Sequence, residues 1–436
     1  MVTEFQQHEV AKLISDGTLM INDGYRAKNS ELSHAGIPFA RAGNIDGGFH
    51  FEDSDRVPAE TLAKVGQKKS QAGDVVFTSK GTVGRFAFVR EHTPEFVYSP
   101  QLCFWRSLDA SLIDPRWLFY WMNGREFYLQ FKGVSGQTDM AEYVSLRDQR
   151  AMKMTLPPLS EQKRIAEVLG ALDDKIELNL RMNATLEATA RALFQSWFID
   201  FDPVRAKLDG RKPSGIDPAT ATLFPDSFEE SPLGHIPKGW EVRPLASLTT
   251  YLSRGIGPSY LEQGGVCVLN QKCVRDHRVD FTKSRRHDSV KKPINKRGLQ
   301  LHDVLVNSTG MGTLGRVAQL FYLPEATIVD SHVTIVRAAS NTDPFFLGIN
   351  LTGRETEIEE LGEGSTGQTE LSRIRLGGLK LITPSFDLQK AFGSAVAPLL
   401  MSMSENEKQS RTLSTLRDTL LPKLLSGELS AKALQI

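Results

Sequence analysis

The sequence predicts an α+β protein that contains one module twice, each copy being a β-rich globular domain followed by a long helix. The first indication is an internal repeat. Gly-Thr-Val-Gly-Arg at residues 81–85 recurs as Gly-Thr-Leu-Gly-Arg at residues 312–316, an offset of 231. Gly-Gln-Thr at residues 136–138 recurs at residues 367–369 with the same offset. The second indication is a run of apolar side chains at helical spacing after each landmark. A repeat this long is no solenoid unit, since those run roughly 20–50 residues.

The repeat and a proline-rich stretch divide the chain into six expected segments. They are a first globular domain (1–155), a first long helix (156–203), a connector (204–239), a second globular domain (240–381), a second long helix (382–427) and a tail (428–436). Five prolines and little periodicity between Arg205 and Gly239 indicate a linker at the connector and not a domain.

Composition indicates an ordinary soluble globular protein. Hydrophobic residues make up 40% and charged residues 24% of 436 residues, enough for two or three domains. The chain has no apolar run of 18 residues and no charged-then-apolar leader, so we expect neither a membrane span nor a signal peptide. The three cysteines, Cys103, Cys267 and Cys273, are odd in number and lack metal spacing. They predict free thiols in a reducing cytoplasm.

Each domain is expected to contain short strands separated by glycine turns. Residues 74–78 and 85–89 predict a hairpin, and residues 303–318 predict its counterpart. The chain has no Gly-Lys pair, which excludes a Walker phosphate loop. The glycines are explained by a turn that needs positive φ. A further strand pair is expected at 98–106 and 329–337, with a helix at 115–128.

In both expected helices the apolar residues alternate in four-three steps, which is the a/d pattern of a coiled coil. The first seam is Ile165, Leu169, Leu172, Ile176, Asn179, Asn183 and Leu186, and the second is Phe392, Val396, Leu399, Met403, Asn406, Ser410 and Leu413. Ser160 and Asp387 are the expected N-caps. At ~1.5 Å per residue, each helix would be a rod of roughly 58 Å.

Both seams become polar near their middle. If the helices pair antiparallel, Asn179 meets Ser410 and Asn183 meets Asn406. Buried polar pairs of this kind fix register and orientation more than they stabilise. The alternative is two amphipathic helices that pack separately, each on its own domain.

Charge is balanced overall, with 52 basic and 52 acidic residues, but it is unevenly distributed. Residues 271–300 hold ten Lys/Arg against three Asp. This stretch is either a solvated loop or a contact for phosphates. Motifs for catalysis are missing: there is no His-Glu-x-x-His, Gly-x-Ser-x-Gly, metal-spaced Cys/His cluster or dinucleotide fingerprint. Glu161-x-Lys163 lacks the upstream Pro-Asp partner of a nuclease, so a latent hydrolase is disfavoured.

Several stretches together resemble the specificity subunits of type I restriction–modification enzymes. Residues 156–166 (Leu-Pro-Pro-Leu-Ser-Glu-Gln-Lys-Arg-Ile-Ala) open the first helix, and residues 192–203 (Ala-Leu-Phe-Gln-Ser-Trp-Phe-Ile-Asp-Phe-Asp-Pro) end it. Residues 234–240 (Gly-His-Ile-Pro-Lys-Gly-Trp) open the second domain, and residues 420–429 (Leu-Leu-Pro-Lys-Leu-Leu-Ser-Gly-Glu-Leu) end the second helix. Gly73-Asp74 with its hairpin also matches. The similarity spans nearly the whole chain, and the long connector is its one departure.

The resemblance implies two target recognition domains, each reading one half of a split site in double-stranded DNA. The helices would form an antiparallel coiled coil that sets the half-site spacing and docks two methyltransferase subunits. The chain itself would be non-catalytic. S-adenosylmethionine would be bound by the methyltransferase, and ATP and magnesium would be used by motor–nuclease subunits. The expected DNA contacts are Lys272, Arg275, Arg278, Arg285, Arg286 and Arg316 in the second domain, and Arg41, Asn44, Lys80 and Arg85 in the first. The rival hypothesis is a two-domain scaffold that binds only proteins.

Overall fold

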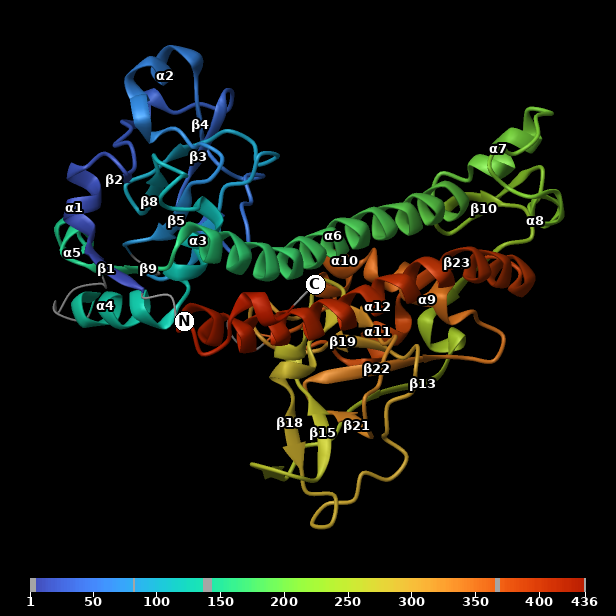
Figure 1. The fold of residues 1–436 in the computed structure, drawn as a ribbon. Helices are drawn as coiled ribbons and strands as arrows, with labels where there is room; N and C mark the ends of the chain where they lie inside the picture. The colour runs from blue at the N-terminus through green and yellow to red at the C-terminus, as the bar shows by residue number, and fades with distance from the viewer. Residues whose placement is uncertain (1–4, 81–82, 136–142, 365–368, 435–436) are drawn as a thin grey trace. The chain divides into compact units, whose positions relative to one another are not determined.

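A computed structural model describes residues 5–80, 83–135, 143–364 and 369–434. The chain forms two compact units, which Figure 1 shows as a ribbon. The first unit comprises Met1–Glu177 and Ser410–Ile436, and the second comprises Leu178–Gln409. Each long helix therefore contributes to both units. Of the repeat landmarks, residues 81–82, 136–138 and 367–368 lie outside the described part of the chain.

The first unit is built on an antiparallel four-stranded sheet with the strand order β2-β8-β5-β6. Its strands are β2 Leu19–Asp23, β8 Leu102–Ser107, β5 Val75–Thr78 and β6 Phe86–Phe88. A smaller sheet has the order β4-β3-β7 (Arg56–Val57, Ile37–Ala40, Val97–Tyr98), with β3 and β7 parallel. A third pairing joins β1 Gln6–Glu9 to β9 Lys153–Leu156. The predicted hairpin is confirmed as the β5–β6 pair.

Strand β5 is buried along its whole length because both faces of the sheet are covered. Val75 and Phe77 point to one face, where they pack with Trp105 in a core that includes the helices of this unit. Val76 and Phe104 point to the other face and join a second core. This alternation is the two-residue period of a strand, so a continuous apolar run here marks a central strand.

The second unit repeats this arrangement. Its four-stranded sheet has the order β13-β22-β19-β20, formed by Thr249–Arg254, Val333–Ala338, Val304–Asn307 and Val317–Gln319. A second sheet, β14-β18-β15-β21, is formed by Tyr260–Leu261, Arg285–His287, Val266–Leu269 and Thr327–Val329, and again one pair, β15–β21, is parallel. The pairing of β12 Glu241–Pro244 with β23 Lys380–Thr383 corresponds to that of β1 with β9. A short hairpin joins β16 Val274–Arg275 to β17 Arg278–Val279.

Helices complete both units. In the first they are α1 Val10–Ser15, α2 Ala59–Val65, α3 Pro115–Met122, α4 Arg125–Ser135 and α5 Leu146–Arg150. In the second they are α7 Asp202–Leu208, α8 Pro218–Thr222, α9 Pro344–Thr352, α10 Glu355–Glu360 and α11 Arg373–Gly378. The two long helices are α6 Leu159–Phe198 and α12 Phe386–Leu425, each of 40 residues.

Three sequence expectations about helix ends were wrong. Residues 115–128 are not one helix, because the chain breaks between α3 and α4 at Gly124, where a Cβ would lie 2.5 Å from Leu425 Cδ1. The long helices begin later than residues 156 and 382, since those residues lie in β9 and β23. Ser160 and Asp387 are therefore inside the first helical turn and are not N-caps.

The connector between the first helix and the second globular domain contains short elements. It contains α7, α8 and a hairpin of β10 Phe228–Ser231 with β11 Gly234–Pro237. Phe201, Val204, Phe224 and Ile236 are buried in one cluster with Trp197 at the end of α6. The proline-rich stretch is thus packed on the helix end, and its irregular periodicity reflects short elements that share a core.

Within each unit, α6 and α12 contact one another. In the second unit Asn179 Nδ2 donates to Asn406 O (3.3 Å) and Gln409 Oε1 (2.9 Å). Asn183 Nδ2 donates to Met403 O (3.1 Å), so residues later in α6 face residues earlier in α12, which is an antiparallel order. The pairing of Asn183 with Asn406 is confirmed by a hydrogen bond of 2.8 Å between their side chains. The pairing of Asn179 with Ser410 stays a prediction.

The seam residues proposed from the sequence are buried or half-buried. Asn179 and Asn183 are 0% and 1% exposed despite their polarity. Cys103, Cys267 and Cys273 are buried free thiols. In the described part of the chain, no helix has the length and apolar character needed to cross a membrane.

Candidate nucleic-acid interface

Each unit holds an Asp–Arg pair at an equivalent place in its four-stranded sheet, with a buried aspartate and an arginine that is buried in the first unit and half-buried in the second. In the first, Arg106 donates from Nε to Asp74 Oδ1 (2.5 Å) and from Nη2 to Asp74 Oδ2 (2.7 Å). In the second, Arg337 makes the same two bonds to Asp303, both at 2.7 Å. Burial alone would lower the pKa of Arg106, but its hydrogen bonds to Asp74 raise it. The pairs fix the base of the β5–β6 and β19–β20 hairpins, which were predicted to carry functional side chains.

A glycine at equivalent positions brings a loop close to each sheet. A Cβ on Gly24 would lie 2.0 Å from Ser99 O, and a Cβ on Gly255 would lie 1.9 Å from Val329 O. Only glycine permits this approach of backbone to backbone. In the first unit the loop that begins at Gly24 then reaches Arg26 and Asn29. We call the two Asp–Arg pairs and these two glycines the shared frame.

At the end of the frame, the first unit has a hollow of about 480 Å³ with both apolar and polar walls, called the polar hollow below after its charged and amide side chains. It is lined by Arg26, Ala27, Asn29, Leu32, Phe39, Arg41, Lys80, Ser99, Pro100 and Gln101. Three of these residues are cationic and none is acidic. The lining comes from four separate segments: the loop after β2, the end of β3, the end of β5 and the turn between β7 and β8. A hollow of this kind suits an anionic or acceptor-rich group.

The structure brings together two of the four first-domain residues expected to contact DNA. Arg41 and Lys80 line the polar hollow. Arg41 also pairs with Asp55 (2.6 Å). Asn44 instead holds the loop backbone, accepting from Arg41 N and donating to His50 O, both at 2.8 Å. Arg85 likewise donates to a backbone oxygen, Ile45 O, at 3.2 Å.

The second-domain arginines have different environments. Arg285 lies 3.5 Å from the ring centroid of Tyr260, a cation–π contact. Arg286 is held by Glu325, with hydrogen bonds of 2.6 and 2.9 Å that raise the pKa of Arg286. Arg316 donates to Gly312 O (2.6 Å) in its own turn. Of these three, Arg286 is already neutralised by a carboxylate.

Lys272, Arg275 and Arg278 lie on or next to the β16–β17 hairpin. Lys272 and Arg275 are exposed, and Arg275 is 3.4 Å from Asp276. Arg278 does not face solvent in the same way. Its Nε lies 2.9 Å from Glu407 Oε1 on α12. The structure therefore places Arg278 against the helix pair, where it orients the domain.

His277 makes a second contact between this hairpin and the helices. Its Nδ1 lies 3.1 Å from Glu187 Oε1 on α6, and its Nε2 lies 3.6 Å from Glu355 Oε2 on α10. Its hydrogen bonds with Glu187 and then Glu355 raise the pKa of His277 to about 9. The residue has a φ of 58°, a left-handed conformation that side chains rarely adopt. The imidazolium thus links the hairpin turn to two helices.

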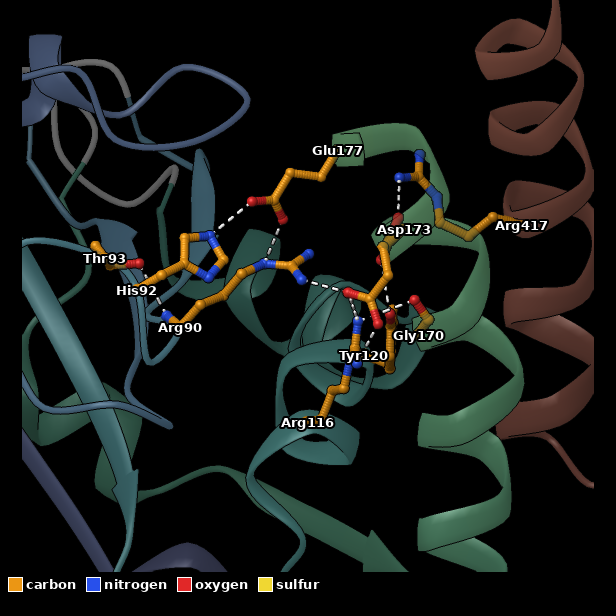
Figure 2. A network of polar contacts seen from close by, with 10 residues as sticks. Arg90, His92, Thr93, Arg116, Tyr120, Gly170, Asp173, Glu177 and Arg417 are labelled. Atoms are coloured by element: carbon orange, nitrogen blue, oxygen red, sulfur yellow. Dashed lines mark hydrogen bonds and ion pairs between the residues drawn. The ribbon is translucent and has the colours of Figure 1, made fainter. Parts of the chain in front are cut away.

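The first unit holds its part of α6 by a comparable set of charges (Figure 2). Arg116 donates to Asp174 Oδ1 (2.6 Å) and Gly170 O (2.9 Å). Arg90 contacts Asp174 as well, and its Nε lies 2.8 Å from Glu177 Oε2. Burial would raise the pKa of Asp174, but the hydrogen bonds from Arg116 and Arg90 lower it. These contacts fix the globular part of the first unit relative to this helical segment.

Asp173 extends this network to the other helix (Figure 2). It accepts from the Tyr120 hydroxyl at 2.6 Å and from Arg417 Nη1 of α12 at 2.8 Å. One carboxylate thus joins the globular domain, α6 and α12 within the first unit. Burial, and then the charge of Asp173, raises the pKa of Tyr120 well above its ordinary value.

Sequence reasoning missed Arg26, Asn29, Ser99 and Gln101 of the polar hollow. A signal existed for two of them, because Ser99 and Gln101 fall opposite Asp330 and His332 at the repeat offset of 231. Polar positions that differ between two otherwise similar halves are candidates for selective binding. No group of three His, Cys, Asp or Glu side chains in the described residues could hold a metal ion.

Comparisons with known proteins agree with this architecture. Residues 2–188 match the family model of the type I restriction modification DNA specificity domain. The HindI specificity subunit of Haemophilus influenzae is 24% identical over 407 residues, covering 83% of this chain and 88% of that protein. The MjaIX specificity subunit of Methanocaldococcus jannaschii is 23% identical over 381 residues, covering 83% and 79%.

A solved structure shows the same fold. The S subunit of a type I restriction-modification system from M. genitalium matches 97% of this chain and 96% of its own, with a TM-score of 0.59 and 14% identity. The repeated sheets and two long helices therefore have a known structural counterpart. The chain is thus similar to type I restriction enzyme specificity subunits over most of its length, and its residues 2–188 match their DNA specificity domain.

Proposed function

We propose that this chain is a DNA sequence-recognition subunit that reads a bipartite site, one half-site for each globular domain. The observation that carries the proposal is the shared frame, which occurs once in each unit. Two copies of one frame suit two similar targets, and the two halves of a split DNA site are such targets. The cationic lining of the polar hollow adds support, since DNA presents phosphates and acceptor-rich base edges.

The helix pair is proposed to set the distance between half-sites and to dock two methyltransferase subunits. Each long helix has 40 residues, so at ~1.5 Å per residue it is about 60 Å long. Half-sites on one face of B-DNA are separated by about one turn, ~34–36 Å, or a multiple of it. The buried asparagines of the second unit support this role, because their hydrogen bonds favour one register of α6 against α12.

The chemistry is proposed to reside in the partners. The chain would be non-catalytic and cytoplasmic, with S-adenosylmethionine bound by the methyltransferase and ATP and magnesium used by motor–nuclease subunits. The similarity to named specificity subunits of restriction enzymes supports the proposal that other subunits carry out the catalysis.

Mobility-shift assays test the proposal against a scaffold that binds only proteins. The chain would be incubated with duplexes of random sequence, alone and with its methyltransferase partner, and the bound duplexes sequenced. We expect the assembly to select two short motifs with a fixed gap. A scaffold would join the methyltransferase without selecting any sequence. Methyl transfer by the purified chain alone would contradict the non-catalytic role.

A further inference from the structure

Backbone contacts identify which residues of the two units occupy the same place at the end of the frame. Ser79 N donates to Gln101 O (3.0 Å), and Ser308 N donates to His332 O (2.8 Å). The next residues, Lys80 and Thr309, form equivalent antiparallel bridges, to Tyr143 and Glu370. Lys80 therefore corresponds to Thr309, and Gln101 corresponds to His332.

The side chains at these places have different chemistry. In the first unit, Lys80 is exposed and has no side-chain hydrogen bond or ion pair among the described residues. Gln101, which lines the hollow, uses its Oε1 to accept from Ala42 N (3.0 Å), and its Nε2 has no hydrogen-bond partner among the described residues. In the second unit, the Thr309 hydroxyl instead bonds His332 Nδ1 (2.7 Å) and Gln271 Oε1 (3.2 Å).

A third position points to a ligand at the first hollow. Ser99 is 2% exposed, and its hydroxyl has no hydrogen-bond partner among the described residues. A buried hydroxyl without a partner is unfavourable, and an incoming acceptor or donor would satisfy it. Its counterpart at offset 231 is Asp330, whose Oδ1 accepts from His332 N (2.9 Å).

Phosphate contact does not account for this pattern. The phosphate backbone is the same at both half-sites, so two domains that touched only phosphates would gain nothing from different side chains. Base edges do differ between half-sites and need different donors and acceptors. The shared frame is the same in both units, whereas the polar residues at its end differ. This difference indicates that these residues contact the edges of DNA bases.

We propose that Lys80 and Gln101 in the first unit, and Thr309 and His332 in the second, are specificity-determining residues for their half-sites. The inference rests on the proposed function. Lys80 and Gln101 present donors, which suit the two acceptors, O6 and N7, of guanine in the major groove. Thr309 and His332 form a mixed donor and acceptor pair and select a different base.

An exchange between the units tests this directly. The double variant Lys80→Thr with Gln101→His gives the first unit the side chains that the second unit has at the corresponding backbone positions. Thr309→Lys with His332→Gln is the reciprocal variant, and Lys12→Thr removes an exposed charge of the first unit as a control. Each is assembled with the methyltransferase partner, and the methylated motif is sequenced.

We expect the first exchange to change the first half-site while the second half-site and the spacer stay as they are, and the reciprocal exchange to do the converse. Lys12→Thr should leave the motif unchanged. An unaltered motif in both exchanges would overturn the inference. So would uniformly weaker binding to all sequences with a salt slope reduced by about 1, which marks a phosphate contact.

A second variant covers the case in which an exchange does not fold. Lys80→Ala truncates one exposed side chain, and we expect it to reduce discrimination at one base pair roughly tenfold. Equal discrimination would again overturn the inference. If the assembly with the unaltered chain selects no motif, the proposed function itself fails. If the unaltered chain selects a motif and the exchanges leave it unchanged, only this inference fails.

Discussion

Asn406 donates a hydrogen bond from its side-chain amide to Asn183 Oδ1 across 2.8 Å. Asn183 is 1% exposed, and its own amide donates to Met403 O. A polar pair buried in an apolar seam stabilises little relative to leucine but penalises every other register. The Asn406–Asn183 hydrogen bond is therefore expected to hold α6 and α12 in one register.

The asparagine pair is expected to behave as a unit. Asn183→Leu alone leaves the Asn406 amide without its partner and should lower the free energy of unfolding by about 1–3 kcal/mol. Asn406→Leu should act similarly, whereas the double variant should cost less than the sum of the two. Urea unfolding of the four proteins measures this coupling. Strictly additive effects would show that the hydrogen bond contributes nothing.

The Asp–Arg pair of each sheet is expected to be important for stability. Asp74→Asn leaves Arg106 buried beside a neutral amide and should cost about 3–5 kcal/mol. Asp303→Asn should have a comparable effect through Arg337. The control is Asp209→Asn, whose exposed pair with Arg211 spans 2.7 Å and should contribute no more than about 1 kcal/mol. Equal losses in Asp74→Asn and Asp209→Asn, measured by urea unfolding, would refute this ranking.

His277 is expected to make stability depend on pH. Its pKa is about 9 in the folded chain, above the ordinary value of 6.5. The protonated form is thus favoured by folding, so its contribution is complete below about pH 6.5 and is lost as pH rises through 9. Glu187 and Glu355 face the imidazole and raise its pKa, while Arg191 opposes them.

The test of this pH dependence compares the chain with His277→Asn, since asparagine tolerates a left-handed backbone. The difference in melting temperature between the two proteins should shrink between pH 6.5 and pH 9.5. A difference that stays constant over this range would mean that the imidazolium pairs do not stabilise the unit.

The helix pair is expected to determine the distance between half-sites. Seven residues inserted at the middle of both α6 and α12 keep the seam in register and lengthen each helix by about 10 Å. The assembly should then recognise the same half-sites with an altered spacer, or lose the native site. Methylation of only the original spacer by a variant that folds and assembles would assign the spacing to the partner subunits.

Much of this architecture could be predicted from the sequence because it is periodic or repeated. The seam from Ile165 to Leu186 follows the four-three spacing that buried helix faces require, and Asp74 matches Asp303 at an offset of 229, once the two predicted hairpins are aligned. Helix ends were less predictable, since the apolar spacing of residues 115–128 continues across the break between α3 and α4 at Gly124. The packing of residues 204–239 depends on tertiary contacts of Phe224 and Ile236.

The candidate site was predicted only in part, for a physical reason. A run of basic residues in a sequence does not show which of them pair with carboxylates in the folded chain. Arg286 and Arg278 were expected to contact DNA, but the structure pairs them with Glu325 and Glu407. Lys80 was identified because it lies next to the turn of a predicted hairpin. Arg26 and Asn29 lie on a loop whose course is fixed by Gly24, and no local pattern marks them.

The most direct test of the central claim is the methylome of a host that lacks other adenine methyltransferases and expresses this chain with its methyltransferase partner. We expect methylation at one bipartite motif, two short half-sites with a fixed gap, and none when the chain is omitted. Methylation at a single continuous motif, or the same methylation without this chain, would contradict the claim that its two domains read the DNA.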